Sequence, residues 1–361
     1  TAGSGGAMLN IIRRLDPARF APAVAVLKKG GRLDAEVERL GIPFLEAPFT
    51  LTAKPYPSLP LRAWQVARVF RPYHFDLWHS FHYSDDYTEP LIAYLAGACG
   101  WLYTKKNMSW GSRAWLLRSL FARRIAAQNQ DMLTSFFDRR WLSKKTSLVP
   151  RGVDTQKFQP GLPHRLGIRQ QYGLSAEAPL IACVADLVPV KGHPILLHAM
   201  AAVPEAHLLL AGRPLDASYA ESLQAQAQEL GISERIHFLG GVSDVPSLLA
   251  ESDLFVLPTL GKGEGCPVAL LEAMACAKAC IATDIPGVRD IIQDGVNGRL
   301  VRAEDPLSLR IAIQKLIENP LERARLGAAA RQRILEQFTI EREVAAHQAL
   351  YLELLRGQVG A

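Results

Sequence analysis

Short β-branched apolar runs alternate along the chain with longer stretches whose apolar positions have helical spacing. The predicted strands are 21–28, 75–80, 100–105 and 146–150 in the first half, and 179–187, 206–212, 235–240, 252–259, 279–285 and 298–301 in the second. Helical stretches lie between them, among them 7–15, 33–41, 193–203, 219–231 and 268–276. Strands that alternate with helices predict an α/β fold whose parallel sheets are joined by right-handed crossovers.

A segment rich in Gly, Pro and charge, residues 151–167, separates two complete alternations and predicts a domain boundary. A chain of 361 residues also fits two domains better than one core. We expect an N-terminal domain over 1–157, a second domain over 158–337, and a last helix over 338–361 after a break at Phe338. Two similar halves place the expected ligand cleft between them, at the carboxyl ends of the strands.

Composition indicates a globular protein, because 49% of the residues are hydrophobic and 21% are charged. No uncharged apolar run reaches the roughly 18 residues that a membrane-spanning helix needs. The five cysteines are scattered without a metal-type pair, which favours buried thiols in a reducing cytoplasm. We therefore expect no structural metal site.

The net charge of +6 is unevenly spread along the chain. Residues 1–158 carry 23 Lys and Arg against 12 Asp and Glu, a net of +11, while residues 159–361 carry 18 against 23, a net of −5. A basic first half suits an anionic membrane, an anionic acceptor or phosphates, and it equally suits a solvated surface with no partner. A nucleic acid is not expected, because no recognition motif accompanies the charge.

A Gly-rich stretch opens the chain and leads into the helix predicted over 7–15. Gly5 and Gly6 would let backbone N–H groups approach an anion at the start of that helix. Glycines at such positions are also common in tight turns. No strand precedes this stretch, so we expect the first sheet to lack its first strand.

Charged residues follow two strands of the second half. Lys191 comes after the strand at 179–187 and can reach a phosphate, although a lone loop lysine is often only solvated. Glu264 lies in the loop after the strand at 252–259, and Glu272 lies more than a turn inside the next helix among apolar neighbours. Spacing alone fits a helix with an exposed acidic face. A ligand diol that partners a buried Glu272 is the alternative.

Two polar clusters end strands of the first half. His79 and His82 lie at the end of the strand at 75–80, and Lys105 and Lys106 end the strand at 100–105. A metal site is disfavoured, because no third ligand is evident beside the histidines. We expect the histidines to line an acceptor cleft and the lysines to point toward the same cleft, with solvated lysines as the simpler alternative.

Four motifs together resemble the retaining glycosyltransferases of the GT-B architecture, family four, also called group one. "GSGGAMLNIIRRLD" is similar to the family's opening loop and first helix, and "LVPRGVDTQKFQP" to its interdomain segment. "VADLVPVKGH" resembles the loop that binds the donor phosphates. "EGCPVALLEAMACAKACIATDIPGVRDIIQDGVNGRLV" resembles the signature block and is the longest and most specific match.

The resemblance implies two Rossmann-like domains facing a central cleft, with a C-terminal helix that crosses back to the N-terminal domain. It implies transfer of a sugar from a nucleotide-diphosphate sugar, with retained configuration and with neither a metal nor a cofactor. Glu272 would bind the ribose hydroxyls, Glu264 the transferred sugar, and Lys191 the diphosphate. The remaining donor contacts would come from Gly5, Gly6, Gly265, Cys266, Pro267 and Val268.

Two positions depart from the family pattern. Asp186 stands where the family usually has an Arg, and would repel a diphosphate unless it points away. Lys106 stands near a frequent His of the first domain and keeps a cation there as a catalytic candidate. A nucleotide-sugar epimerase and a non-catalytic binding or partner subunit are the alternatives. The basic first half suggests a cell-envelope glycan or lipid-linked acceptor and peripheral contact with the inner membrane face.

Overall fold

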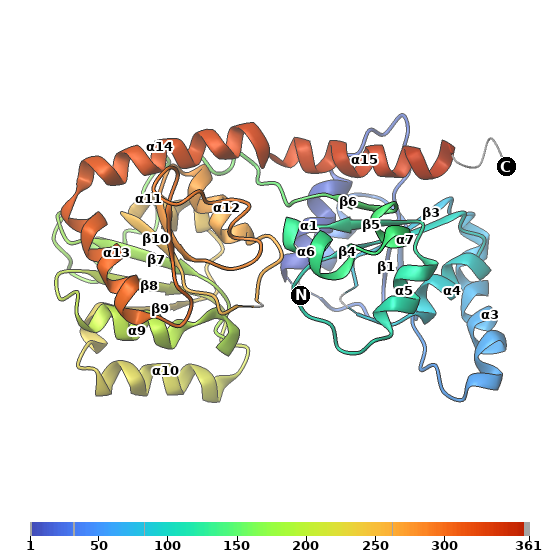
Figure 1. Cartoon of the computed structure of the whole chain (residues 1–361), viewed down its shortest axis with the longest axis horizontal. Helices are drawn as coiled ribbons and strands as arrows, with labels where there is room; N and C mark the ends of the chain where they lie inside the picture. Colours follow the sequence, from blue (N-terminus) through green and yellow to red (C-terminus); the bar gives the residue numbers. More distant parts are fainter. Residues whose placement is uncertain (1, 32, 83, 262, 357–361) are drawn as a thin grey trace. The chain divides into compact units, whose positions relative to one another are not determined.

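A computed structural model describes residues 2–31, 33–82, 84–261 and 263–356 (Figure 1). The chain forms two compact units, of which the first comprises Thr1–Pro150 with Ile340–Ala361 and the second comprises Arg151–Thr339. The sequence placed these boundaries at 157/158 and 337/338, a few residues inside the second unit. The last helix of the chain is thus part of the first unit.

The second unit is built on a six-stranded parallel sheet with strand order β12-β11-β10-β7-β8-β9. Its strands are β7 (Leu180–Val184), β8 (His207–Ala211), β9 (Ile236–Gly240), β10 (Leu254–Leu257), β11 (Ala279–Thr283) and β12 (Arg299–Val301). Every one of them lies within a strand predicted from the sequence. Because all pairs are parallel, the carboxyl ends of the strands meet at one edge of the sheet.

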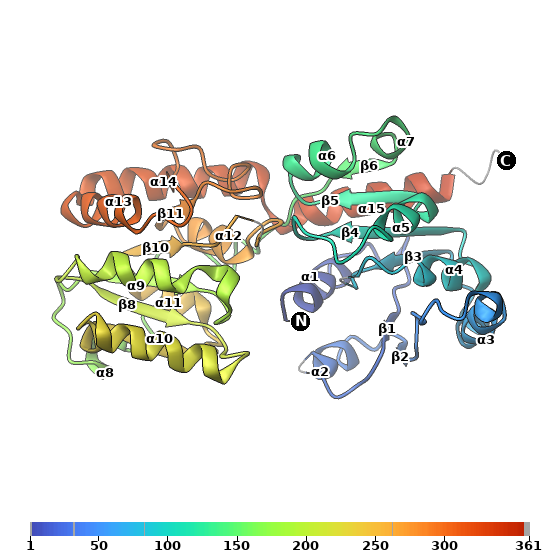
Figure 2. The ribbon, with the colours of Figure 1, turned by 60° about the horizontal axis from the view of Figure 1, so that its bottom comes forward.

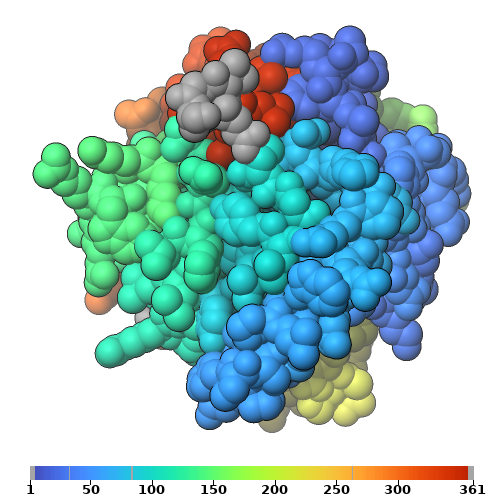
Figure 3. All heavy atoms as spheres, turned by 90° about the vertical axis from the view of Figure 1, so that its right-hand side faces the viewer, coloured from blue at the N-terminus to red at the C-terminus, as the bar shows by residue number. Residues whose placement is uncertain are grey.

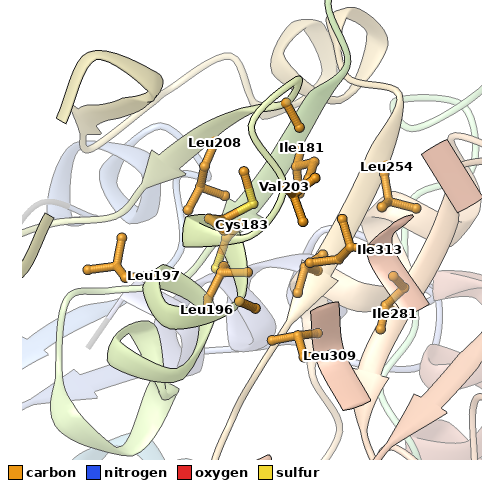
Figure 4. Packing of buried hydrophobic residues seen from close by; sticks show 14 of the residues in the cluster. Ile181, Cys183, Leu196, Leu197, Val203, Leu208, Leu254, Ile281, Leu309 and Ile313 are labelled. Atoms are coloured by element: carbon orange, nitrogen blue, oxygen red, sulfur yellow. The ribbon is translucent and has the colours of Figure 1, made fainter. Parts of the chain in front are cut away.

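Helices cover both faces of this sheet, as Figure 2 shows for α9 and α10 on one side. One face carries α9 (His193–Ala201), α10 (Ala217–Glu229) and α13 (Pro306–Glu318), and the other carries α11 (Val245–Glu251), α12 (Val268–Ala275) and α14 (Pro320–Gln337). Alternate side chains of each strand face opposite layers, so Ile181 and Cys183 join the first core (Figure 4). Ala182, between them, joins the second core. The smaller elements are α8 (Ile168–Gln171), η3 (Pro189–Lys191) and η4 (Ser233–Arg235).

The first unit contains two parallel sheets. A pair is formed by β1 (Val24–Val26) and β2 (Phe44–Glu46), and a four-stranded sheet has the order β3-β4-β5-β6. The four strands are β3 (Leu77–Ser80), β4 (Gly100–Lys105), β5 (Arg124–Ala127) and β6 (Thr146–Leu148). The sequence predicted β1, β3, β4 and β6 but neither β2 nor β5.

Helices also pack on both faces of the four-stranded sheet. The helices of this unit are α1 (Ala2–Ile12), α2 (Asp34–Glu38), α3 (Leu59–Phe70), α4 (Thr88–Leu95), α5 (Trp115–Phe121), α6 (Gln130–Phe136), α7 (Arg140–Ser143) and α15 (Ile340–Arg356), with short 3-10 turns η1 (Tyr56–Ser58) and η2 (Arg71–Tyr73). Ile125 of β5 packs with α4 and α6, whereas Ala126 faces Leu350 of α15. The predicted break between the last two helices falls at Phe338–Thr339 and is confirmed.

The Gly-rich start of the chain differs from its prediction. Gly5 and Gly6 lie inside α1 with helical backbone, not in a loop before it. Close packing accounts for one of them, because a Cβ added at Gly5 would lie 2.4 Å from Cδ1 of Leu33. Glycine costs a helix only about 1 kcal/mol relative to alanine, so a packed helix tolerates it. Among the described residues, none of the helices has the length and apolar character needed to span a bilayer.

Candidate functional site

Two loops meet at the carboxyl edge of the second unit's sheet. The loop after β7 leads through η3 to Lys191, and Gly192 follows with φ +71°. A Cβ at Gly192 would lie 2.1 Å from the carbonyl oxygen of Pro258, so only glycine allows this approach. Leu260 N–H donates to the Val190 carbonyl at 2.8 Å and ties the loop after β10 to the loop after β7.

This arrangement brings Lys191 and Glu264 into contact. Lys191 Nζ lies 2.6 Å from Glu264 Oε1, and the Thr259 hydroxyl donates to the same oxygen at 2.8 Å. The Glu264 side chain is 8% exposed and the Lys191 side chain 22%, so the carboxylate is shielded from water more than the cation. Thr259 is held in turn by Thr283, whose hydroxyl donates to its carbonyl at 2.5 Å. The carboxylate is fixed at the edge of the sheet, and its cation remains accessible.

Glu272 occupies the second turn of α12 and is partly buried. Burial raises its pKa to about 7, while the charges of Lys157 and Arg151 act in the opposite direction. Its side chain makes no hydrogen bond or ion pair with any other described residue. A carboxylate in such a place gains from hydrogen-bond donors that a ligand supplies.

The segment between the two glutamates leads into α12. Gly265, Cys266 and Pro267 are buried and Val268 is partly buried, with Pro267 as the residue that precedes the helix. The backbone N–H groups at the start of α12 have no partner within the helix, which makes this end attractive to negative charge. The sequence predicted this helix start correctly.

Asp186 does not stand as an unpaired charge. Arg213 lies just beyond the end of β8 and donates two hydrogen bonds to the Asp186 carboxylate. Its Nη2 lies 2.6 Å from Oδ2 and its Nε lies 3.0 Å from Oδ1. Burial acts to raise the pKa of Asp186, but the hydrogen bonds and charge of Arg213 outweigh it, and the pKa is lowered. Both side chains are about one-third exposed. Neither Arg213 nor Thr259 was among the predicted site residues, and the sequence marks each of them only by its place at the end of a strand.

The predicted site residues His79 and Lys106 form hydrogen bonds with residues of the first unit. His79 accepts or donates at both ring nitrogens, to Tyr351 of α15 at 2.7 Å and to Thr104 at 2.9 Å. Burial, with the nearby His347 and Lys106, keeps the pKa of His79 well below its ordinary value. Lys106 Nζ donates to the carbonyl of Phe81.

His82 lies in the loop after β3, with its ring edge-on to Phe49 at 5.6 Å between centroids. Its Nδ1 is buried without a hydrogen-bond partner among the described residues. Burial is the main cause that lowers the pKa of His82. Of the two histidines, His82 is the one with an unused ring nitrogen.

Lys105 is the last residue of β4 and Lys106 follows the strand, and the two side chains contact different groups. Lys105 Nζ lies 3.7 Å from the ring centroid of Trp110 and donates to the Ser109 carbonyl at 2.5 Å. Burial lowers its pKa to about 7. The expectation that both lysines point toward one cleft is therefore wrong for Lys105.

A buried ion pair lies beneath the loop that carries His82. Arg118 of α5 and Glu89 of α4 meet at 2.9 Å with side chains 1% and 2% exposed. Ser80 donates to Glu89 at 2.8 Å, and Arg118 Nη1 donates to the carbonyl of Asp86 at 2.6 Å. The pair thus fixes both ends of the loop after β3. Among the described residues, no group of three or more His, Cys, Asp or Glu is placed to hold a metal ion.

Comparison with known proteins finds relatives for the second unit. Residues 165–333 match the family model of the glycosyl transferases group 1. A GDP-mannose-dependent alpha-(1-6)-phosphatidylinositol monomannoside mannosyltransferase of Mycolicibacterium smegmatis is 32% identical over 201 residues, 53% of this chain and 52% of that protein. An N-acetyl-alpha-D-glucosaminyl L-malate synthase of Bacillus anthracis is 33% identical over 193 residues, 52% of this chain and 49% of that one. The chain spans about half the length of the curated relatives it matches.

Solved structures extend the likeness in fold to the whole chain. A glycosyltransferase of Rickettsia africae superposes with a TM-score of 0.85 at 18% identity, covering 98% of this chain and 95% of that one. Anabaena HepE, in complex with UDP and glucose, gives 0.82 at 22% identity, with 97% and 96% covered. The chain therefore has the GT-B fold, with two Rossmann-like domains.

Proposed function

We propose that the protein transfers a sugar from a nucleotide-diphosphate sugar to an acceptor with retained anomeric configuration. The observation that carries the proposal is the Lys191–Glu264 pair, fixed where β7 and β10 end. It lies within the residues that match the group 1 glycosyl transferases. A cation and a shielded carboxylate at the carboxyl edge of a parallel sheet suit a charged ligand with sugar hydroxyls.

The donor would be bound by side chains of both signs. Glu272 accepts hydrogen bonds from the ribose hydroxyls, which gives its partly buried carboxylate hydrogen-bond donors. When the donor binds, Lys191 leaves Glu264 and contacts the diphosphate. The Glu264 carboxylate can then accept hydrogen bonds from the transferred sugar. Arg213, already positioned by Asp186, adds a second cation close to the phosphates. Asp186 then positions a cation and does not repel the donor, which weakens the case for a non-catalytic subunit.

Transfer would depend on stabilising the departing diphosphate. The bond between the anomeric carbon and the phosphate oxygen breaks, and the acceptor oxygen attacks from the same face. The acceptor proton passes to the leaving diphosphate. Lys191, Arg213 and the N–H groups at the start of α12 stabilise the negative charge that develops, so the step needs neither a metal nor an organic cofactor.

The acceptor side is assigned to the first unit. Lys106 and His82 lie after β4 and β3, at the carboxyl edge of that unit's sheet. The relatives' names point to different acceptors, a phosphatidylinositol monomannoside in one case and L-malate in the other. The net charge of +11 over residues 1–158 supports an anionic acceptor, a cell-envelope glycan or lipid-linked intermediate, at the cytoplasmic side of a membrane.

A calorimetric screen of nucleotide sugars tests the donor assignment. One nucleotide sugar is expected to bind, and Lys191→Ala and Arg213→Ala each weaken it about 10- to 100-fold, the loss expected for a charge-assisted contact. Lys315→Ala, an exposed lysine on α13 of the same unit, is the matched control and leaves the affinity unchanged. The proposal fails if no nucleotide sugar binds, or if Lys191→Ala binds as tightly as the control.

A further inference from the structure

Positive charge gathers at one edge of the first unit, where the strands of the four-stranded sheet begin. Because β3 to β6 are parallel, the segments that precede each strand meet at this edge: η2 before β3, the end of α4 before β4, the end of α5 before β5, and α7 before β6. We call this surface the basic edge. The protein's predicted acceptor residues lie at the opposite, carboxyl edge.

Contacts join these segments into one continuous surface. Arg71 Nε donates to the carbonyl of Leu95 at 3.0 Å, which ties η2 to the end of α4. Tyr94 donates through its hydroxyl to the carbonyl of Phe121 at 2.7 Å, which ties α4 to α5. Lys145 donates to the carbonyl of Leu120 at 2.9 Å and lies 5.3 Å from the ring of Trp141, which ties α5 to α7. Figure 3 views the protein from this side.

The basic edge exposes large apolar side chains among its cations. Tyr73, Leu120, Phe121 and Trp141 are 44%, 56%, 39% and 42% exposed. The bases of these segments are Arg71, Arg123, Arg124, Arg139, Arg140, Lys144 and Lys145, and the acids are Asp76, Asp138 and Glu353, of which Glu353 pairs with Arg124. No acid occurs between Glu46 and Asp76 in the sequence. The surface therefore combines a local excess of four positive charges with exposed aromatic rings.

We propose that the basic edge docks on an anionic lipid bilayer. Trp and Tyr prefer the level of the lipid headgroups, Leu and Phe insert their apolar ends, and Arg and Lys attract anionic headgroups. The apolar side chains stand among cations, as Lys145 over the ring of Trp141 does, and this mixture matches a headgroup layer better than it matches a peptide or a second folded chain. Neither this surface nor a lipid partner is required by the donor chemistry.

Docking at this edge leaves the opposite edge free. The six residues of β4 separate the two edges by about 20 Å at roughly 3.3 Å per residue. The acceptor residues at the carboxyl edge then stand away from the bilayer. An acceptor whose reacting end extends from the membrane, such as a glycan on a lipid anchor, fits this geometry.

Vesicle sedimentation of the full chain tests the proposal. The protein is expected to sediment with vesicles of phosphatidylcholine and phosphatidylglycerol, not with phosphatidylcholine alone, and less at high salt than at low salt. The triple variant R139E/R140E/K144E should lose at least 100-fold in partitioning, since each cation contributes roughly fivefold near an anionic surface. F121S/W141S should lose about tenfold with the charge intact.

The control for the apolar pair is I311S/L321S, which changes two exposed apolar residues of the second unit and should sediment normally. Equal sedimentation with both vesicle types, sedimentation with neither, or variants that match the control would each overturn the proposal. Calorimetry with the donor on the same variants shows whether they remain folded and donor-competent. A lost membrane interaction with intact donor binding is thereby separated from a failure of the proposed transfer.

Discussion

Asp186 shows what a single residue conceals in a sequence. From the sequence, the Asp186 carboxylate was expected to repel a diphosphate, because its ion-pair partner could not be identified there. That partner, Arg213, is 27 positions away and follows the neighbouring strand. Lys191 and Glu264, 73 positions apart, were predicted as site residues from a motif, but their ion pair arises only from the contact between two loops. Residue type and place after a strand were predictable. Pairings between strand ends were not, because they depend on strand order.

The perturbed carboxyl of Glu272 gives a pH prediction for donor binding. Its pKa of about 7 lies above the ordinary 4.5, so the folded protein binds an extra proton between these values and its stability falls as pH rises through them. Ribose hydroxyls favour the ionised form. Affinity for a nucleotide sugar should therefore rise about tenfold from about pH 6 to about pH 8, measured by calorimetry.

An intact nucleotide sugar is used because its diphosphate has no group that titrates in this range. Glu272→Gln is the matched variant, and its weaker binding should be independent of pH. An unchanged affinity of the wild type across the range would show that the carboxyl does not meet the ligand in its ionised form. A pH dependence that persists in Glu272→Gln would assign it to another group.

At the scale of elements, runs of branched apolar residues allowed strands to be predicted from the sequence. A strand composed mainly of alanine was not predicted. The Ile-, Leu- and Val-rich strands of the second unit were all identified. β5 reads Arg-Ile-Ala-Ala, and alanine favours helix when taken alone, so only its place between β4 and β6 makes it a strand. β2 reads Phe-Leu-Glu and contains no β-branched residue. The glycines led to a wrong predicted start for α1, and at Gly5 the close approach of Leu33 leaves no room for a Cβ.

The buried pair of Glu89 and Arg118 supports a prediction about how α4 and α5 hold the loop after β3. Glu89→Ala leaves the guanidinium buried without its anion and should destabilise the first unit by about 3–5 kcal/mol. Replacing both residues with methionine removes both charges and should recover most of that loss. Urea unfolding, with hydrogen exchange of the β3 and β4 amides as the probe, measures the change in the free energy of unfolding of the first unit.

Arg13→Ala serves as the comparison, since Arg13 forms an exposed ion pair with Glu36 and its loss should cost at most about 1 kcal/mol. If Glu89→Ala proved as mild as Arg13→Ala, the buried pair would contribute little to the position of this loop.

The molecule as a whole consists of two units with separate cores. Unfolding should therefore occur in two transitions, of which only one responds to a nucleoside diphosphate. At a concentration of 100 times its Kd the ligand adds about 2.7 kcal/mol to the unit that binds it. That corresponds to an increase of about 5–10 °C in the Tm of a unit of this size. Scanning calorimetry with and without ligand measures both transitions.

Hydrogen exchange assigns the transitions, and protection of β7 and β10 should follow the ligand-sensitive one. A single cooperative transition would show that the two cores do not unfold independently. A ligand that raised the first unit's Tm alone would place the nucleotide elsewhere.

The chain enters and leaves the second unit side by side. Val153 N–H donates to the Phe338 carbonyl at 2.9 Å, and Val153 and Thr339 form a parallel bridge. These contacts lie within three residues of the two points where the chain passes between the units, 150/151 and 339/340. A segment whose two ends are joined in this way is topologically an insert in its host. Residues 151–339 should therefore be exchangeable as a unit between proteins of this fold. Such a chimaera would test whether the second unit selects the proposed donor and the first unit the proposed acceptor.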